Sequence, residues 1–246
     1  MNIGIIVQTR MGSTRLPGKV LMNADQKNLM LDYSINQMKS SKNIHKIIIA
    51  TTDLERDNVI ETFCKKNNVD VYRGSEKNVL DRHYKCAKKF SLSHIIRIPS
   101  DKPLIDPQII DLVIETFTSN QFDYVANFGV IQKNSELVLN STFPSGTEVE
   151  MMSFNALENA WKNAITDDDK EHVTPYIYLN PEKFKIKIIN QDENLSHLRW
   201  SLDYEKDLFV IREIIKNIPQ RPILMTDIVQ FLNKNPEIKN LNNIET

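Results

Sequence analysis

The chain has 246 residues, of which 31 are Lys or Arg and 32 are Asp or Glu, so its formal net charge is -1. This balance provides no overall positive field for binding nucleic acid, and no apolar run approaches the ~20 residues that span a bilayer. With 41% hydrophobic residues, the composition is that of a globular protein that can bury a sizeable core.

The amino terminus and the two cysteines indicate where the protein works. Residues 1–9 contain a short apolar run with no basic segment before it and no small-residue cleavage site, which is typical of a strand and not of a signal peptide. Cys64 and Cys86 fall on predicted helices far apart in the sequence, which favours reduced, partly buried thiols over a disulfide. Both observations predict a cytoplasmic protein.

Strands and helices alternate through the first half of the chain. Apolar runs predict buried strands at residues 3–7, 44–51, 69–72, 94–98 and 123–126. Apolar residues at helical spacing predict helices between them, most clearly in the amphipathic segment from Ile109 to Phe117. This order predicts a three-layer α/β/α sandwich with a mostly parallel twisted sheet, whose ligands bind beyond the carboxyl ends of the strands.

The second half is less regular. We expect one domain over residues 1–246, with an inserted arm or hairpin within residues 127–152. Ser153 is expected to cap one helix and Thr226 another. The remaining expected elements are, in chain order, a solvated turn at 167–169, a helix at 172–179, strands at 184–189 and 198–202, and helices at 204–216 and 227–233.

A loop rich in cations, from Gln8 to Lys19, follows the first predicted strand. Arg10, Arg15 and Lys19 stand beside two glycines and several hydroxyls, among them Gly12 and Ser13. Arginine grips phosphate oxygens with paired N–H groups, lysine adds a point charge, and glycine lets backbone N–H groups approach a polyphosphate closely. A solvated basic surface loop is the alternative, and the spacing is not that of a P-loop. The position directly after a buried strand favours phosphate binding.

An ordered set of motifs resembles a known family. Residues 10–19 (RMGSTRLPGK) are similar to the signature of the cytidylyltransferases, which include the CMP-KDO and CMP-sialic acid synthetases, and most of all to their spore-coat polysaccharide members. Similar segments continue along nearly the whole chain, at residues 50–53, 72–76, 79–82, 101–107, 171–176 and 198–203. The resemblance implies a nucleotide-diphospho-sugar transferase fold of the GT-A, Rossmann-like type, CTP as a substrate, Mg²⁺ as the cofactor and a homodimer.

Two aspartates are candidate magnesium ligands. Asp101 follows the strand predicted at 94–98, and Asp203 follows the one predicted at 198–202. Magnesium prefers few carboxylates together with waters and substrate phosphates, so both could meet one ion that faces the basic loop. A turn at Asp101 and a helix cap at Asp203 are the alternatives. The resemblance implies the metal role for both, although Pro99-Ser100 departs from the Gly or Thr-Gly that often precedes the first aspartate in the family.

The resemblance also implies residues that contact the nucleotide. Within the basic loop, Gly12 and Ser13 join the three cations around the phosphates. Arg73, Asp81 and Arg82 correspond to family positions near the base and ribose, where surface ion pairs are the alternative.

Four residues of the second half are candidates for the sugar site. Glu148 and Glu150 alternate along an extended segment, so both side chains leave the same face, toward either a hydroxyl-rich ligand or solvent. Arg199 could reach an acidic substrate. His172 is a further candidate, although a lone histidine at a helix start more often has a structural role. Residues 76–80 lack the His and Ser-Gly-Thr run of the KDO-specific enzymes, which argues against KDO itself.

Together these features predict an enzyme that transfers CMP from CTP to a sugar, sugar acid or sugar phosphate for surface polysaccharide synthesis and releases pyrophosphate. Lys19, Arg15 and Asp101 are the expected catalytic residues, because such chemistry depends on positioning and on neutralising the charge that develops. A glycosyltransferase of related fold is disfavoured, since Asp101-Lys102-Pro103 offers a single aspartate. A non-catalytic nucleotide-binding subunit is the other alternative.

Overall fold

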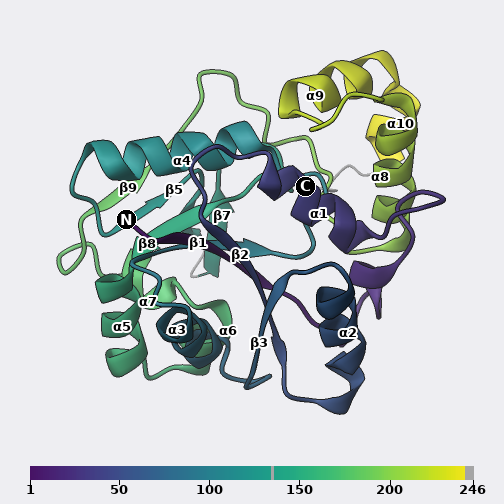
Figure 1. Cartoon of the computed structure of the whole chain (residues 1–246). Coiled ribbons are helices and arrows are strands. Elements are labelled where there is room, and N and C mark those ends of the chain that lie inside the picture. The colour runs from purple at the N-terminus through teal and green to yellow at the C-terminus, as the bar shows by residue number, and fades with distance from the viewer. Residues whose placement is uncertain (134–135, 242–246) are drawn as a thin grey trace.

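A seven-stranded sheet forms the centre of the computed structural model, which describes residues 1–133 and 136–241 (Figure 1). The strands of this sheet are β1 (Ile3–Gln8), β2 (Lys46–Thr52), β3 (Asp70–Gly74), β4 (His94–Pro99), β5 (Tyr124–Ala126), β8 (Glu150–Ser153) and β9 (Ile186–Ile188). They lie in the order β3-β2-β1-β4-β8-β5-β9. Neighbours pair in parallel, except that β8 is antiparallel to β4 and β5. The predicted mostly parallel sheet is confirmed.

Helices cover both faces of this sheet. Their bounds are α1 Met30–Lys39, α2 Asn58–Lys66, α3 Val79–Lys89, α4 Pro107–Ser119, α5 Phe154–Asn163, α6 Asp167–His172, α7 Pro175–Tyr178, α8 Glu205–Asn217, α9 Met225–Lys234 and α10 Pro236–Leu241. Because side chains alternate along a strand, Ile5 and Val7 pack with α1, α2 and α4, whereas Ile6 packs with α3, α5 and α7. The layered α/β/α arrangement is therefore confirmed.

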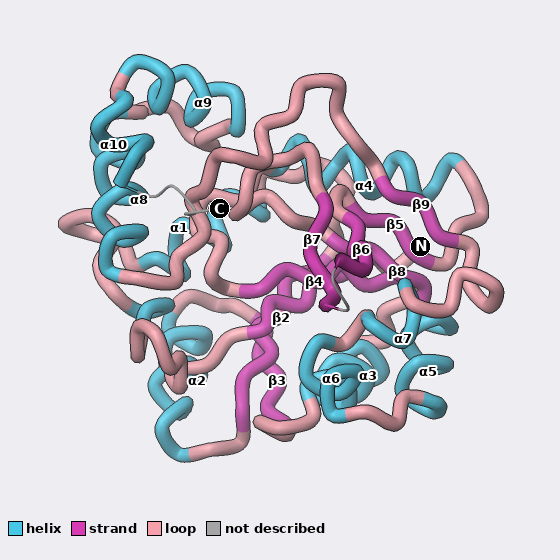
Figure 2. Tube along the Cα trace, turned by 180° about the vertical axis from the view of Figure 1, so that it is seen from behind, coloured by secondary structure: helices cyan, strands magenta, loops and turns pink. Residues whose placement is uncertain are grey.

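A third apolar cluster lies beyond the two faces of the sheet. It joins α8 and α9 to Met30 and Tyr33 of α1 and to the buried Trp200. Figure 2 shows α8, α9 and α10 gathered at one end of the molecule, away from α5 and α7. These helices place the segment before α8, which carries Asp203, over the carboxyl edge of the sheet.

The carboxyl ends of β1, β2 and β4 lie side by side. Gln8 at the end of β1 pairs with Ala50 of β2 on one side and with Pro99 of β4 on the other. The basic loop after β1 and the segment carrying Asp101 after β4 therefore leave the sheet at the same edge, where α/β sheets bind their ligands.

A two-stranded antiparallel sheet stands apart from the central one, within the segment 127–152. It consists of β6 (Gly129–Lys133) and β7 (Glu136–Asn140). Val130 pairs with Leu139, and Ile131 with Val138, so the two apolar pairs lie on opposite faces. Part of this expected insertion, residues 134–135, lies outside the described ranges.

The segment 198–202, expected to be a strand, does not join a sheet. Its backbone bonds to Ser145 and, through the N–H of Leu202, to the carbonyl of Asp101 at 2.8 Å. Apolar residues alternate along this segment because Leu198, Trp200 and Leu202 are buried in the cluster with α8 and α9. The segment thus serves as a strap that brings Asp203 next to Asp101.

Residues 167–179 form two short helices, where a turn and one longer helix were expected. The side chain of Thr166 accepts a hydrogen bond from the N–H of Asp169, so the three aspartates begin α6 and do not form a solvated turn. Val173, at a φ of 74°, separates α6 from α7. The expected cap at Ser153 is confirmed, whereas Thr226 is not a cap, because α9 begins at Met225.

Both cysteines are buried and neither forms a disulfide. Burial raises the pKa of the Cys64 and Cys86 thiols to about 12, so neither is suited to act as a nucleophile. Within the described ranges, the helices are too short or too polar to cross a membrane.

Candidate active site

The basic loop between β1 and α1 is folded by its own backbone and anchored by a buried carboxylate. The carbonyl of Met11 accepts hydrogen bonds from the N–H groups of Ser13 and Gly18, each at 2.9 Å. Gly18 has a φ of 72°, which glycine adopts without strain, and a 3₁₀ turn begins at Lys19. Asp57, just before α2, is fully buried and accepts the N–H of Met11 at 2.7 Å. The loop is therefore preorganised, and the anchoring role of Asp57 had no signal in the sequence pattern.

This loop meets both predicted metal ligands. Lys19 Nζ lies 3.0 Å from Asp203 Oδ1 and 4.0 Å from Asp101 Oδ2. It also donates to the carbonyl of Leu202 at 2.5 Å. Arg15 Nη2 lies 2.7 Å from the same oxygen of Asp203. Two distant segments of the sequence thus converge on one group of charges.

Asp203 is nearly buried and pairs with three cations. In addition to Lys19 and Arg15, Arg199 approaches it, with Nη2 2.5 Å from Oδ2. Burial raises the pKa of this carboxyl, but the hydrogen bonds and charges of the cations outweigh burial and leave the pKa below 3.8. Asp207, which is fully buried, accepts the N–H of Asp203 at 2.7 Å and so fixes the backbone of an ionised carboxylate.

Asp101 presents an oxygen that lacks a partner. Its Oδ1 is buried and has no hydrogen-bond partner among the described residues, which is costly unless a ligand satisfies it. A free carboxylate oxygen beside a second carboxylate suits a hard cation such as Mg²⁺ that takes its remaining ligands from phosphates and water. In the described part of the chain, no cluster of three or more His, Cys, Asp or Glu could hold a metal without such ligands.

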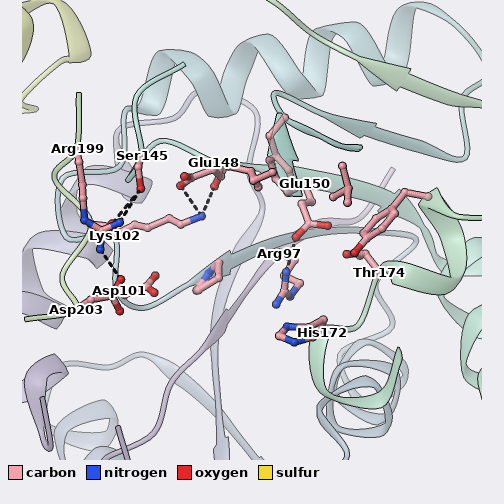
Figure 3. Close-up of a pocket in the computed structure, with 16 residues that line it drawn as sticks. Arg97, Asp101, Lys102, Ser145, Glu148, Glu150, His172, Thr174, Arg199 and Asp203 are labelled. Atoms are coloured by element: carbon pink, nitrogen blue, oxygen red, sulfur yellow. Dashed lines mark hydrogen bonds and ion pairs between the residues drawn. The ribbon is translucent and has the colours of Figure 1, made fainter. Parts of the chain in front are cut away.

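Two cavities meet at these aspartates. The smaller, about 180 Å³, is lined by the basic loop, including Arg10 and Ser13, and by both aspartates. Gly12 does not line it and instead lies against the guanidinium of Arg56. The larger cavity, about 300 Å³, continues from the aspartates toward Glu150 of β8 (Figure 3). Val130 and Leu139 of the β6–β7 pair also line it.

All four residues predicted for the sugar site line the larger cavity. Glu148 and Glu150 are only 9% and 2% exposed, so the alternative of a solvated strand face is wrong. Arg199 lies at the end near Asp203, and His172 lies at the opposite end, as Figure 3 shows. The His172 side chain is exposed, and its Nε2 lies 3.5 Å from Asp168 Oδ1.

Two cations that the sequence did not single out pair with these glutamates. Lys102 Nζ lies 2.9 Å from Glu148 Oε2 and donates to the Glu148 carbonyl at 3.0 Å. Arg97 pairs with Glu150 Oε1, and the hydroxyl of Tyr124 donates to Glu150 Oε2 at 2.8 Å. An arginine inside the apolar run of β4 was a usable signal, because a buried charge without a partner is costly.

Arg73 and Asp81 line neither cavity. Arg73 holds the connection after β2 and pairs with Glu61 at 2.8 Å. Asp81 accepts a hydrogen bond from Trp161 Nε1 at 2.9 Å and pairs with Lys85 at the same distance. The ion-pair alternative thus describes both residues, and the structure does not bring them to the basic loop.

Arg82 lies fully buried beneath the loop between β3 and α3, so the surface ion-pair alternative is wrong for it. Its Nη1 donates to the carbonyl of Ser75 at 2.7 Å, while Nε and Nη2 have no partner within the described residues. Burial lowers its pKa to about 10, and the positive charge of Arg10 acts in the same direction. Arg82 is therefore close enough to the basic loop to sense its charge, and a contact with the nucleotide stays a prediction.

Known proteins share the sequence pattern of this chain over most of its length. The sequence model of the cytidylyltransferase family matches residues 4–220. The spore coat polysaccharide biosynthesis protein SpsF of Bacillus subtilis is 32% identical over 244 residues, which are 96% of each chain. An uncharacterized protein of Methanocaldococcus jannaschii is 40% identical over 98% of this chain and 95% of its own.

Solved structures share the fold. A cytidylyltransferase from Leptospira borgpetersenii superposes with a TM-score of 0.89 over 100% of both chains, at 29% identity. A CMP-KDO synthetase complexed with CTP has the same fold, with a TM-score of 0.64 over 88% of this chain and 99% of its own, at 14% identity. Taken with the match of the family's sequence model, these likenesses establish that the chain belongs to the cytidylyltransferase family.

Proposed function

We propose that this protein uses CTP to transfer CMP to a sugar, sugar acid or sugar phosphate, with release of pyrophosphate, in surface polysaccharide synthesis. One observation carries the proposal: Lys19 and Arg15 converge on Asp203 beside the free oxygen of Asp101, where two cavities meet. The family supports nucleotidyl transfer, and the name of the related SpsF protein supports the pathway.

The smaller cavity suits the triphosphate. Arg10 lines it, and in the described ranges no carboxylate forms an ion pair with its guanidinium. The Arg15 side chain is 51% exposed, so it can turn from Asp203 to a phosphate oxygen at small cost. Lys19 is fixed more firmly, because the carbonyl of Leu202 also holds its ammonium.

The two aspartates fit the proposed magnesium ion. When bound, Mg²⁺ would neutralise charge on the triphosphate and on the departing pyrophosphate. Asp101 would offer its unpartnered Oδ1, and Asp203 would exchange part of its contact with Arg15 for the ion. Asp207 would keep the Asp203 backbone in place during this exchange.

The reaction needs no covalent intermediate. An acceptor oxygen forms a bond to the α-phosphorus, while the bond from that phosphorus to the bridging oxygen breaks and pyrophosphate leaves with the electron pair. A hydroxyl acceptor releases its proton to water, whereas a phosphate acceptor attacks as the dianion and has none to lose. Lys19, Arg15 and Arg10 stabilise negative charge that develops on the phosphate oxygens, and the rigid loop supplies orientation.

A pyrophosphate-release assay tests this function. CTP, UTP, ATP and GTP are each combined with a panel of sugar acids and sugar phosphates, with and without Mg²⁺. We expect release only with CTP, an acceptor and the metal together. Nucleotide binding without turnover would support a non-catalytic subunit, and transfer of sugar from a nucleotide sugar would support a glycosyltransferase.

We also propose that the protein is a cytoplasmic homodimer. CTP is a cytoplasmic metabolite, and free buried cysteines suit a reducing compartment. On the β6–β7 pair, Ile131 and Val138 lie directly opposite each other and are 46% and 38% exposed. An exposed apolar pair on a two-stranded sheet is suited to contact a second copy of the chain.

A further inference from the structure

Each Lys and Arg side chain that lines the larger cavity lies against a carboxylate. Lys102 lies against Glu148, and Arg97 against Glu150. The third cation, Arg199, lies against Asp203 and also within 3.6 Å of the buried carboxylate of Asp207. Each cation in the wall thus already has a carboxylate partner, so the cavity holds no unpaired positive charge among the described residues.

The Lys102–Glu148 and Arg97–Glu150 pairs are largely buried, and each glutamate also accepts a hydrogen bond from a neutral donor. The N–H of Gly146 donates to Glu148 Oε2 at 3.0 Å, and the hydroxyl of Tyr124 donates to Glu150. Burial raises the pKa of Glu148, but Lys102 and the hydrogen bonds outweigh burial and keep the pKa below its ordinary value. Glu148 is therefore a carboxylate in a fixed position, and Glu150 is held in place by Arg97 and Tyr124. Separating either glutamate from its cation would leave a buried charge unpaired.

The smaller cavity has a different charge pattern. There, Arg10 is not engaged by a carboxylate in the described ranges, and Arg15 is half exposed beside a single aspartate that it shares with Lys19 and Arg199. Cations in that cavity are available to an anion, as the triphosphate requires. Because the two cavities adjoin, this contrast separates an anion-binding part of the site from a part whose charges are satisfied.

We propose that the larger cavity receives the uncharged, hydroxyl-rich body of the acceptor, and that any anionic group of the acceptor stays at the end that attacks CTP. The inference rests on the proposed function and adds the chemical class of the acceptor. Hydroxyl groups donate to the fixed carboxylates, and the apolar faces of a sugar ring pack on Phe128, Val130 and Leu139 in the same wall. A second anion there meets two buried carboxylates and, among the described residues, no Lys or Arg that lacks a carboxylate partner, which disfavours its binding.

Glu148 is the specificity-determining residue, because its carboxylate pairs with Lys102, which lines the same cavity. In the variant Glu148→Gln, the amide oxygen still accepts from Gly146 and the volume is unchanged, but Lys102 loses its counter-charge. The variant is expected to accept an anionic acceptor body that the natural protein rejects. Glu150→Gln acts in the same way on Arg97 and serves as the second variant if the first does not fold.

The experiment uses acceptor pairs that differ only in one distal group. Glucose 1-phosphate is compared with glucuronic acid 1-phosphate, and galactose 1-phosphate with galacturonic acid 1-phosphate, by kcat/KM for pyrophosphate release from CTP. Binding of the same compounds is followed by saturation-transfer NMR, with the protein saturated in a non-hydrolysable CTP analogue and Mg²⁺. We expect the neutral-bodied member to be preferred roughly tenfold or more, and Glu148→Gln to reduce or reverse that preference. Glu115→Gln, which changes an exposed carboxylate on α4, is the matched control and should leave the preference unchanged.

The outcomes separate this inference from the proposed function. Pyrophosphate release with any acceptor supports the function, and the ratio within each pair tests the acceptor class. The inference is overturned, while the function stands, if kcat/KM for the uronic acid member equals or exceeds that for the neutral member. It is also overturned if Glu148→Gln and Glu150→Gln leave the kcat/KM ratio within each pair unchanged. Binding of neither member also overturns it. Binding with the expected preference, but without turnover for any acceptor, supports the cavity assignment and counts against the function.

Discussion

Lys19 and Asp203 are separated by 184 positions in the sequence, yet their charged groups lie 3.0 Å apart. Both side chains are about one-tenth exposed, at 11% and 9%, so solvent screens their attraction less than it screens a surface pair. The contact fixes the first loop of the chain to the segment that precedes α8. The proposed metal–triphosphate complex would therefore bind where the protein already holds balanced charge.

Replacing Lys19 with Ala should reduce turnover more than it reduces stability. The change removes a cation beside the expected triphosphate, and loss of such a contact typically lowers kcat on the order of 100-fold or more. Arg15 and Arg199 continue to neutralise Asp203, so the fold should persist. Pyrophosphate release and circular dichroism measure the two effects, with Lys234→Ala, at the exposed end of α9, as the control. Turnover equal to that of the natural protein would remove Lys19 from the site.

Asp101→Asn should raise the Mg²⁺ concentration needed for half-maximal activity. The substitution keeps the shape of the side chain but replaces the charged oxygen that lacks a partner in the described structure. A chelator should abolish activity in the natural protein, and added Mg²⁺ should restore it. Titration of Mg²⁺ at saturating CTP makes the measurement, and Asp192→Asn, an exposed change, should have no effect. An unchanged requirement for the metal in Asp101→Asn contradicts its role as a ligand.

Gly146→Ala should destabilise the protein by about 1–3 kcal/mol. Gly146 has a φ of 107°, and a Cβ there would lie 2.9 Å from both the N–H nitrogen of Ser201 and Cδ1 of Trp200. Urea unfolding gives the free energy. Gly129→Ala is the matched control, because a Cβ there meets nothing closer than 3.7 Å. Equal effects of the two substitutions would show that the backbone at Gly146 relaxes easily.

His83 should make the stability of the fold depend on pH below neutrality. Burial, with the nearby charge of Arg97, lowers the pKa of this imidazole well below 6.5 in the folded state. The unfolded chain binds the proton at a pH near 6.5, so stability is complete above that pH and falls as the pH decreases, by up to ~1.4 kcal/mol per pH unit. The difference in unfolding free energy between pH 7 and pH 5.5 should shrink in His83→Leu. The same pH dependence in both proteins would assign it to other groups.

Val138→Glu should convert the proposed dimer into a monomer. The substitution places a charge in the exposed apolar pair formed with Ile131, and burying an unpaired charge in an interface is costly. Size-exclusion chromatography with light scattering reports the mass. Leu112→Glu, at an exposed position of α4, is the control. A natural protein that is monomeric at all concentrations, or a Val138→Glu protein that stays dimeric, contradicts the proposal.

The sequence could predict that the basic loop and the two aspartates lie together, because each follows a buried segment whose end is visible in the apolar pattern. It did not predict the pairing of Arg97 with Glu150, which depends on the register of the antiparallel strand β8. The local sequence also could not show that the side chains of Asp81 and Arg82 lie in different places. Neighbouring helix positions point in different directions, so one side chain reaches Trp161 while the other is buried near the basic loop.

The reversed strand β8 has a consequence for how the site can diversify. Its register places Glu150 directly opposite Arg97, while the chain between β5 and β8 leaves the central sheet and returns to it. Within that excursion, the β6–β7 pair makes, over its described residues, no hydrogen-bonded ladder with the central sheet, so changes in its length and composition leave β1 and β4 in place. Such changes would alter one wall of the larger cavity while the basic loop after β1 keeps its position.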